Sequence, residues 1–183
     1  MNFKVLMICT VELDRNGITT WILNYSRQLC LFGNKVDVLS AEICTVDVQY
    51  ELEKSGCSVK ELSPRKENTI TYFHDLIKLI KKEKYDIVHI HAEGPAAFCR
   101  IPQLFGKKIV VTVHGIDHRR EKWQGGLGSK FILFGEKCAV KYADEIIVLS
   151  RGVQDYFRQT YGRETVFIPN GVNRPEGRAA DLI

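Results

Sequence analysis

The sequence lacks the features that mark several protein classes. Its six cysteines occur singly, with no Cys-x-x-Cys pair. This spacing argues against a disulfide framework or a zinc ribbon and is typical of a protein in a reducing cytosol. No apolar stretch approaches the ~18 residues that a membrane-spanning helix needs. The apolar run from Val5 to Val11 is too short for a signal peptide, and no small-residue cleavage site precedes Glu12.

Several nucleotide-binding and catalytic motifs are also missing. The sequence contains no Gly-x-Gly-x-x-Gly, no Gly-x-x-x-x-Gly-Lys-Ser/Thr and no Gly-x-Ser-x-Gly. It therefore has no dinucleotide fingerprint, no P-loop and no nucleophile elbow. The net charge of +4 is too small to indicate nucleic-acid binding by itself. With 45% hydrophobic and 26% charged residues, the 183-residue chain fits one ordinary domain with its own core, or at most a tight pair of domains.

Apolar runs of strand length alternate along the chain with amphipathic stretches of helix length. The runs Asp86–Ile90 and Lys108–Val113 are rich in β-branched residues and continuous, as in strands that are covered on both faces. Repeated strand–helix–strand units with right-handed crossovers predict a doubly wound parallel sheet of the Rossmann-like α/β class. We expect strands at 3–9, 35–39, 58–62, 86–90, 108–113, 145–149 and 165–168, and helices at 18–32, 45–54, 68–84, 94–105, 127–142 and 152–161.

The composition changes near the end of the chain. After Pro169 the sequence continues with Asn170-Gly171 and then with small, charged and further proline residues, which is typical of a linker. We therefore expect one domain over residues 1–168 and a hinge over residues 169–183. On this interpretation the chain is a fragment.

Polar, glycine-containing segments follow several of the predicted strands. Ligands of open parallel sheets bind at the carboxyl ends of the strands, where these segments meet. Asn16-Gly17 opens the first helix, so its free N–H groups could face a phosphate or a sugar, although an ordinary turn has the same sequence. His114 and Asp117 directly follow the strand 108–113. An imidazole there could donate to a sugar hydroxyl or move a proton, or could simply satisfy loop carbonyls.

Two further clusters have competing interpretations. His89 and His91 share one strand face, an arrangement that could bind a metal ion. Because no third ligand has a recognisable spacing, the favoured interpretation is that the two rings pack at the strand end. The basic segment 118–123 ends in Trp123 and suits phosphate, pyrophosphate or a bilayer surface; the alternative is a solvated loop. The lysines of the predicted helix 68–84 indicate that one side of this helix faces either the solvent or a membrane. Four aromatic residues are expected in the core: Tyr25, Phe73, Phe131 and Phe134.

Six segments in this order resemble the N-terminal half of a GT-B glycosyltransferase of family 4, a retaining group common in bacterial capsule, exopolysaccharide and lipopolysaccharide assembly. Several of them are ordinary α/β sequence, and their order and spacing make the resemblance specific. They span nearly the whole chain: KVLMIC at 4–9, Asn16-Gly17-Ile18 with the helix ending at Gly33, YDIVHIHAEGP at 85–95, VVTVHGID at 110–117, YADEIIVLS at 142–150 and VFIPNGV at 166–172.

The resemblance implies a two-domain enzyme whose first domain binds mainly the acceptor. The donor, a nucleotide-diphospho-sugar, would bind to a second domain that this chain lacks, so the fragment alone is expected to be inactive. No cofactor and no metal are implied. The implied acceptor is a glycan or a lipid-linked sugar, with an anionic membrane surface as a further partner and no nucleic acid. The implied location is the cytoplasm, peripherally at the inner face of the plasma membrane.

The resemblance also assigns roles to individual residues. Gly17 matches the second glycine of the family's Gly-Gly loop near the donor diphosphate, whereas Asn16 departs from the first. His114 matches the catalytic-site histidine near the transferred sugar. The remaining assignments are Gly115, Ser150 and Arg151 near the donor phosphates; Glu93, Asp117, Arg119, Arg120, Lys122 and Trp123 at the acceptor; and Asn170 and Gly171 in the hinge.

Two other classes of function remain open at this stage. Another GT-B enzyme, such as a sugar-nucleotide 2-epimerase, would share the fold and would need no acceptor. A non-catalytic binding module would also share it, because a fold alone does not fix a function.

Overall fold

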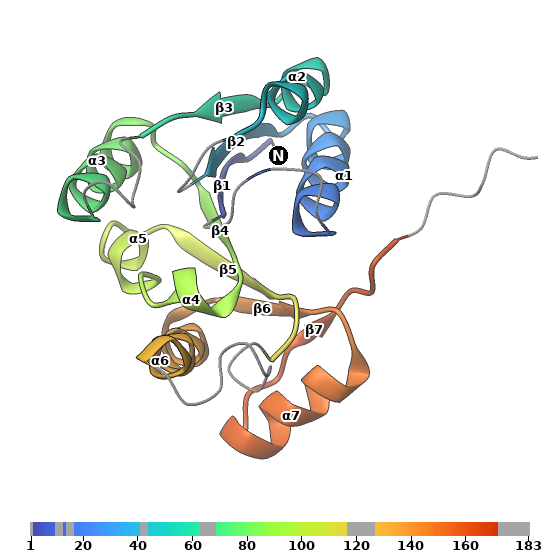
Figure 1. The fold of residues 1–183 in the computed structure, drawn as a ribbon, viewed down its shortest axis with the longest axis vertical. Helices are drawn as coiled ribbons and strands as arrows, with labels where there is room; N and C mark the ends of the chain where they lie inside the picture. The colour runs from blue at the N-terminus through green and yellow to red at the C-terminus, as the bar shows by residue number, and fades with distance from the viewer. Residues whose placement is uncertain are drawn as a thin grey trace, which may run out of the picture.

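A single parallel sheet organises the molecule. The computed structural model describes residues 2–9, 13, 17–40, 44–62, 69–116 and 127–171. Within these residues seven strands pair in the order β3-β2-β1-β4-β5-β6-β7 (Figure 1). All six pairings between neighbouring strands are parallel. The strands are β1 Lys4–Cys9, β2 Lys35–Ser40, β3 Ser58–Lys60, β4 Ile87–His91, β5 Lys108–Val113, β6 Glu145–Val148 and β7 Val166–Phe167. The predicted doubly wound, Rossmann-like sheet is confirmed.

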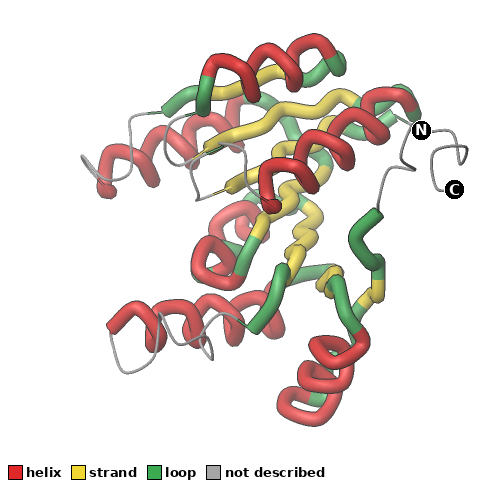
Figure 2. Tube along the Cα trace, turned by 45° about the vertical axis from the view of Figure 1, so that its right-hand side comes forward, coloured by secondary structure: helices red, strands yellow, loops and turns green. Residues whose placement is uncertain are grey.

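Helices cover both faces of this sheet, as the turned view in Figure 2 shows. Alternate residues of β1 enter two separate cores. Met7 packs with Ile22 of α1 and Leu52 of α2, whereas Leu6 packs with residues of the other helices. One face therefore carries α1 Gly17–Leu31 and α2 Val46–Lys54. The other carries α3 Thr69–Lys82, α4 Glu93–Ala96, α5 Arg100–Leu104, α6 Leu127–Tyr142 and α7 Arg151–Tyr161.

The strand order reverses between β1 and β4. From β1 the chain moves outward to β2 and β3, and it then returns to place β4 on the other side of β1. The crossover helices change face at this point, so α1 and the segment after β4 diverge from each other. Ligands of doubly wound sheets bind outside the carboxyl ends of the strands at such a switch point. The topology therefore identifies the ends of β1 and β4 as the first place to look for a site.

Two details differ from the expectations drawn from the sequence. The helix expected at 94–105 is two short helices, α4 and α5, because Pro102 has no N–H to continue the hydrogen-bond ladder. Phe131 and Phe134 do not belong to the core, since 41% and 56% of their surfaces are exposed. The buried face of α6 instead includes Ile132 and Ala139.

Gly135 explains why the buried face of α6 is rotated. A Cβ atom built on Gly135 would lie 1.9 Å from the backbone oxygen of Glu93 and 3.1 Å from the backbone nitrogen of Ala97. Helix α4 therefore rests directly on the backbone of α6, and no side chain fits between them. The face of α6 that contains Gly135 must point inward. Phe134 lies about 100° around the helix from Gly135 and faces the solvent, whereas Phe131, one turn before Gly135, lies at the rim of this face with its ring 6.2 Å from that of Phe98.

Substituting Gly135 tests this packing. We expect Gly135→Ala to lower the free energy of unfolding by about 3 kcal/mol or more, because the new methyl group meets backbone atoms that cannot rotate away. Gly152→Ala in α7 is the matched control, since its Cβ would meet no atom within 4 Å. That variant should be as stable as the parent or more stable by up to about 1 kcal/mol. Equal stability of the two variants in urea unfolding would contradict the close approach of α4 and α6.

Candidate functional site

The register of the sheet brings the ends of the central strands to one edge. Cys9, the last residue of β1, pairs with His91, the last residue of β4. His91 in turn pairs with Thr112 near the end of β5. His114 therefore follows β5 at the same edge as His91. Helix α1 begins at Gly17 and packs on this part of the sheet through Trp21.

A cluster of aromatic and imidazole rings fills the space between α1 and the ends of β4 and β5. The indole of Trp21 lies edge-on to three imidazoles, with ring centroids 5.9 Å from His89, 4.9 Å from His91 and 5.8 Å from His114. Tyr25, one turn further along α1, stacks on Trp21 at 4.5 Å. The rings of His89 and His91 stack on each other at 4.4 Å. These contacts fix the side of α1 that faces the strand ends.

The histidines of β4 are held in their neutral form. His89 and His91 are 2% and 1% exposed, and His89 Nε2 lies 2.7 Å from the hydroxyl oxygen of Thr112. Burial lowers the pKa of His89 to about 3, and it lowers the pKa of His91 well below its usual value. Neighbouring imidazoles act in the same direction, because a second positive charge nearby would repel the first. Both imidazoles are therefore uncharged at neutral pH.

A groove runs along the exposed side of this cluster, between α1 and the segment that follows β7. Its volume is about 550 Å³, a size that suits a small ligand. Gly17, Trp21 and Tyr25 line one wall together with polar residues of α1, and Asn170 and Gly171 belong to the other wall. Three residues singled out from the sequence, Gly17, Asn170 and Gly171, thus meet around one hollow. Trp21 lines this hollow, and its ring also contacts the ring of His114.

Sequence reasoning missed the residues that give this groove its character. Trp21 was not assigned to the site, although it contacts all three imidazoles and lines the groove. Thr20, Asn24 and Gln28 also line it. Their spacing of four residues places them on one side of the helix, beside the apolar stripe. A polar stripe of this kind next to the predicted strand ends is the signal that could have identified them.

The structure also shows where the other predicted residues of this edge lie: Ser150, Arg151 and Gly115. The Ser150 hydroxyl accepts a hydrogen bond of 3.3 Å from Val153 N–H and so caps α7. The guanidinium of Arg151 lies 4.2 Å from the ring centroid of Phe167 and donates to Gln154. Phe167 directly precedes the groove wall that begins at Ile168. Gly115 is half-buried directly after His114.

Glu93 is placed differently from the expectation. Its side chain is fully buried within α4. It is buried because α4 lies directly against α6, and it forms no part of the groove wall. The expected contact with an acceptor would need an exposed carboxylate, so this placement argues against that role. Six predicted residues lie outside the described part of the chain: Asn16, Asp117, Arg119, Arg120, Lys122 and Trp123.

His89 and His91 pack against each other through their imidazole rings. The two imidazoles stack, and His89 is engaged with Thr112. Among the described residues no group of three or more His, Cys, Asp or Glu side chains is arranged to hold a metal ion. The two histidines therefore belong to the buried ring cluster beside Trp21.

The buried histidines predict an acid-sensitive fold. Below pH 6.5 the unfolded chain binds protons on His89 and His91 that the folded chain cannot bind, so stability falls as the pH is lowered. From pH 7 to pH 5 each histidine should cost about 2 kcal/mol. We expect His89→Gln, which stays neutral and can still reach Thr112, to remove roughly half of this loss in urea unfolding. His74→Gln on α3 is the control, because His74 is exposed to solvent. An unchanged pH dependence in His89→Gln would contradict the neutral, buried state.

Solved structures with this fold include glycosyltransferases and a UDP-N-acetylglucosamine 2-epimerase. A glycosyltransferase from Rickettsia africae superposes with a TM-score of 0.64 at 19% identity, covering 94% of this chain and 44% of that one. HepE from Anabaena, solved in complex with UDP, gives 0.68 at 16% identity, covering 93% and 44%. A UDP-N-acetylglucosamine 2-epimerase from Listeria monocytogenes gives 0.63 at 12% identity, covering 90% and 43%. The chain thus spans less than half the length of these neighbours, and at these identities the likeness concerns the fold.

The sequence itself carries the family assignment. No curated protein matches the chain. The pattern of the family described as Glycosyltransferase Family 4, however, matches residues 15–174. The match begins just before α1 and ends after the segment that forms the second groove wall, so it includes the described residues of the site. The chain belongs to Glycosyltransferase Family 4.

Proposed function

We propose that this chain is the acceptor-binding N-terminal domain of a retaining, sugar-nucleotide-dependent glycosyltransferase of capsular, exo- or lipopolysaccharide assembly. The observation that carries the proposal is the groove between α1 and residues 168–171, whose wall residue Trp21 contacts the ring of His114 at the carboxyl edge of the sheet. The family match covers the same residues. The solved neighbours are about twice as long as this chain, which supports a second, donor-binding domain after residues 169–183.

The donor in this proposal is a nucleotide-diphospho-sugar, and the enzyme uses it as a substrate without a resident cofactor. Support comes from HepE, which was solved with UDP bound. In this chain Gly17 is the first residue of α1, so backbone N–H groups and the positive end of the helix dipole adjoin the groove. A Cβ on Gly17 would meet no atom within 4 Å, so the absent side chain leaves open space at the groove wall. That space would let a diphosphate approach the backbone closely.

The chemistry proposed for the site is positioning and charge stabilisation. His114 orients the sugar that is transferred, next to the acceptor hydroxyl. Gly115, Ser150 and Arg151 lie near the departing diphosphate, and Arg151 supplies a positive charge. Such a site lowers the barrier by holding the reactants together and by stabilising the negative charge that develops on the leaving group. The acceptor contacts are assigned to Asp117, Arg119, Arg120, Lys122 and Trp123.

A sugar-nucleotide 2-epimerase is the second candidate, favoured by the structural likeness to the epimerase from Listeria monocytogenes. The two functions differ in their need for an acceptor. With a nucleotide sugar alone, an epimerase converts the sugar and keeps the nucleotide bond, whereas a transferase leaves the sugar configuration unchanged at C2. Product analysis of the complete enzyme by NMR, with and without an acceptor glycan, separates them. Conversion at C2 without acceptor would contradict the proposed transfer.

The role of His114 is tested in the complete enzyme. We expect His114→Ala to lower kcat by about 100-fold or more, because an interaction that forms at the reacting sugar is lost. The melting temperature should stay within a few degrees of the parent, since His114 is only half-buried. His74→Ala, on the opposite face of the sheet, is the control and should retain full activity. Near-parental turnover of His114→Ala would remove this residue from the proposed site.

We further propose that the enzyme is cytoplasmic and associates peripherally with the anionic inner face of the plasma membrane. No helix in the described part of the chain is both long and apolar enough to cross a bilayer. On α6, an exposed stripe at spacings of four, three and four residues consists of Lys130, Phe134, Lys137 and Lys141. A basic stripe with an exposed aromatic suits lipid headgroups, because the cations meet phosphate and the ring enters the interface.

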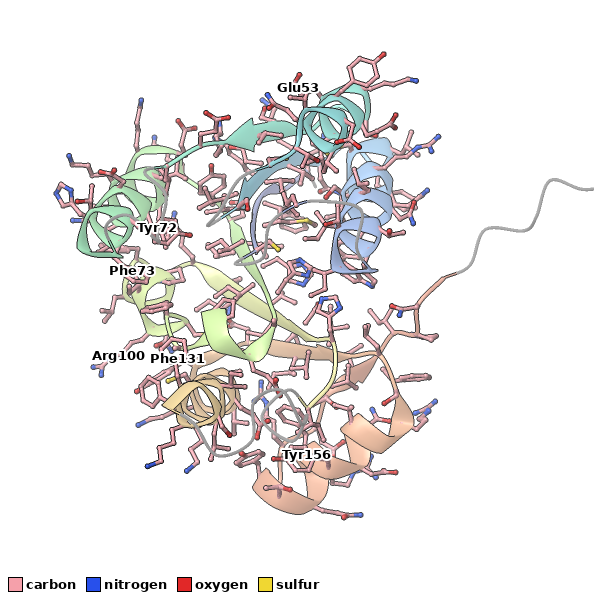
Figure 3. All side chains as sticks on the ribbon, in the orientation of Figure 1. Glu53, Tyr72, Phe73, Arg100, Phe131 and Tyr156 are labelled. Atoms are coloured by element: carbon pink, nitrogen blue, oxygen red, sulfur yellow. The ribbon has the colours of Figure 1, made fainter. Side chains whose placement is uncertain are left out.

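Neighbouring helices extend this basic and aromatic surface. Phe131 lies 6.2 Å from Phe98, measured between ring centroids, and Phe98 lies 4.0 Å from Phe73 of α3. Figure 3 shows Arg100 of α5 and Phe131 of α6 on the same side of the molecule. On α3 the exposed lysines continue the surface, and Lys81 Nζ lies 5.0 Å from the ring centroid of Phe105.

Vesicle co-sedimentation tests this surface. We expect the chain to bind vesicles that contain phosphatidylglycerol and to bind them more weakly as the salt concentration rises. Replacing Lys130, Lys137 and Lys141 together by glutamine should weaken binding by tenfold or more, at roughly 1 kcal/mol per cation. Lys35 at the start of β2 and Lys54 at the end of α2, which are exposed and do not belong to α3, α5 or α6, form the control pair for substitution by glutamine. Equal binding to neutral vesicles, or equal effects of the two sets, would contradict the proposal.

A further inference from the structure

His91 occupies an unusual position beside His114. Its Nδ1 lies 3.4 Å from Nε2 of His114, within hydrogen-bond distance. The contact follows from the sheet, because His91 ends β4, pairs with Thr112 of β5, and His114 stands two residues further along. His91 is only 1% exposed, and no role has been assigned to it so far.

The location of the proton on His91 can be derived from its surroundings. Burial keeps this imidazole neutral, so it carries one N–H, on either Nδ1 or Nε2. The Nε2 atom is buried, and it has no hydrogen-bond partner among the described residues. A buried N–H without a partner is costly and rare, whereas a buried acceptor without one is tolerated more often. The proton therefore belongs on Nδ1, where it can be donated to His114.

This assignment has a consequence for His114. A donor at His91 Nδ1 requires a lone pair on His114 Nε2. In a neutral imidazole the single proton must then sit on the other nitrogen. We propose that His91 is a positioning residue that fixes His114 as its Nδ1–H tautomer. His114 then carries its N–H at Nδ1, so this nitrogen is a hydrogen-bond donor and cannot act as a base.

The surroundings of His91 hold the ring in this orientation. His89 stacks on one side at a centroid distance of 4.4 Å, and Trp21 approaches edge-on at 4.9 Å. The next residue, Ala92, has φ of +79°, a conformation that residues with a Cβ rarely adopt. Its N–H donates to the carbonyl oxygen of Thr112 at 2.9 Å. A strained backbone conformation persists where the surrounding structure enforces it. Here the hydrogen bond of Ala92 joins β4 to β5 just beyond their last paired residues, His91 and Thr112.

The tautomers can be read directly. The measurement is a long-range ¹H–¹⁵N correlation spectrum of the chain labelled with ¹⁵N-histidine, recorded at pH 7.5 and assigned with single-histidine variants. We expect His91 and His114 both to be protonated on Nδ1 and unprotonated on Nε2. Protonation of either residue on Nε2 would overturn the proposal.

Two variants test whether His91 is the cause. Asn at this position can place an amide N–H near the site of Nδ1, whereas Phe keeps the ring and removes the donor. We expect His91→Asn to keep His114 as the Nδ1–H tautomer and His91→Phe to shift it toward Nε2–H. If His91→Phe does not fold, the spectra of the parent and of His91→Asn still test the proposal, because both must show His114 protonated on Nδ1. An unchanged His114 tautomer in folded His91→Phe would overturn the proposal.

The expected effect on activity rests on the proposed function, whereas the expected spectra are independent of it. In the complete enzyme we expect His91→Phe to lower kcat on the order of tenfold, which is the effect of one misplaced hydrogen bond, and His91→Asn to restore most of it. The tautomers are measured without any substrate. Failure of glycosyl transfer in the parent would therefore contradict the proposed function and leave the spectroscopic result intact, whereas a wrong tautomer would contradict only the role of His91.

Discussion

Parallel pairing of β1, β4 and β5 is the constraint on which the site depends. The register aligns Cys9, His91 and Thr112 in one row across the sheet. Every strand then ends at the same edge, and every following helix begins there. Because the strand order reverses between β1 and β4, helix α1 leaves on one face while the segment after β4 leaves on the other. The edge therefore stays open at its centre, and the groove beside α1 occupies part of this opening.

Neutral, tightly packed imidazole rings lie behind Trp21 of the groove wall. His89 and His91 are buried, stack on each other and contact Trp21. Imidazoles that stay uncharged form hydrogen bonds without the desolvation cost of a buried ion. Donors held in such a rigid frame need no reorganisation when charge develops on a reacting group. The groove wall is built from α1 and from residues beyond β7.

Much of the fold could be predicted from the sequence, because apolar periodicity reports burial directly. Lys108–Val113 and Leu127–Tyr142 were predicted with the bounds that the structure shows. Phe131 and Phe134 were wrongly expected in the core. Periodicity suggests a stripe but does not determine which neighbour it meets, and in α6 the approach of α4 onto Gly135 selects another face. The ring contacts of Trp21 arise from the register of β4 and β5, which no local pattern contains.

The central claim is that sugar transfer takes place in the groove lined by Gly17 and the segment after β7, next to His114, which contacts the groove residue Trp21. A crystal structure of the complete enzyme with a bound nucleotide sugar tests it most directly. The account predicts that the diphosphate lies against the backbone at Gly17 and that the sugar lies within hydrogen-bond reach of His114. A sugar bound away from His114, with the diphosphate distant from the start of α1, would contradict it.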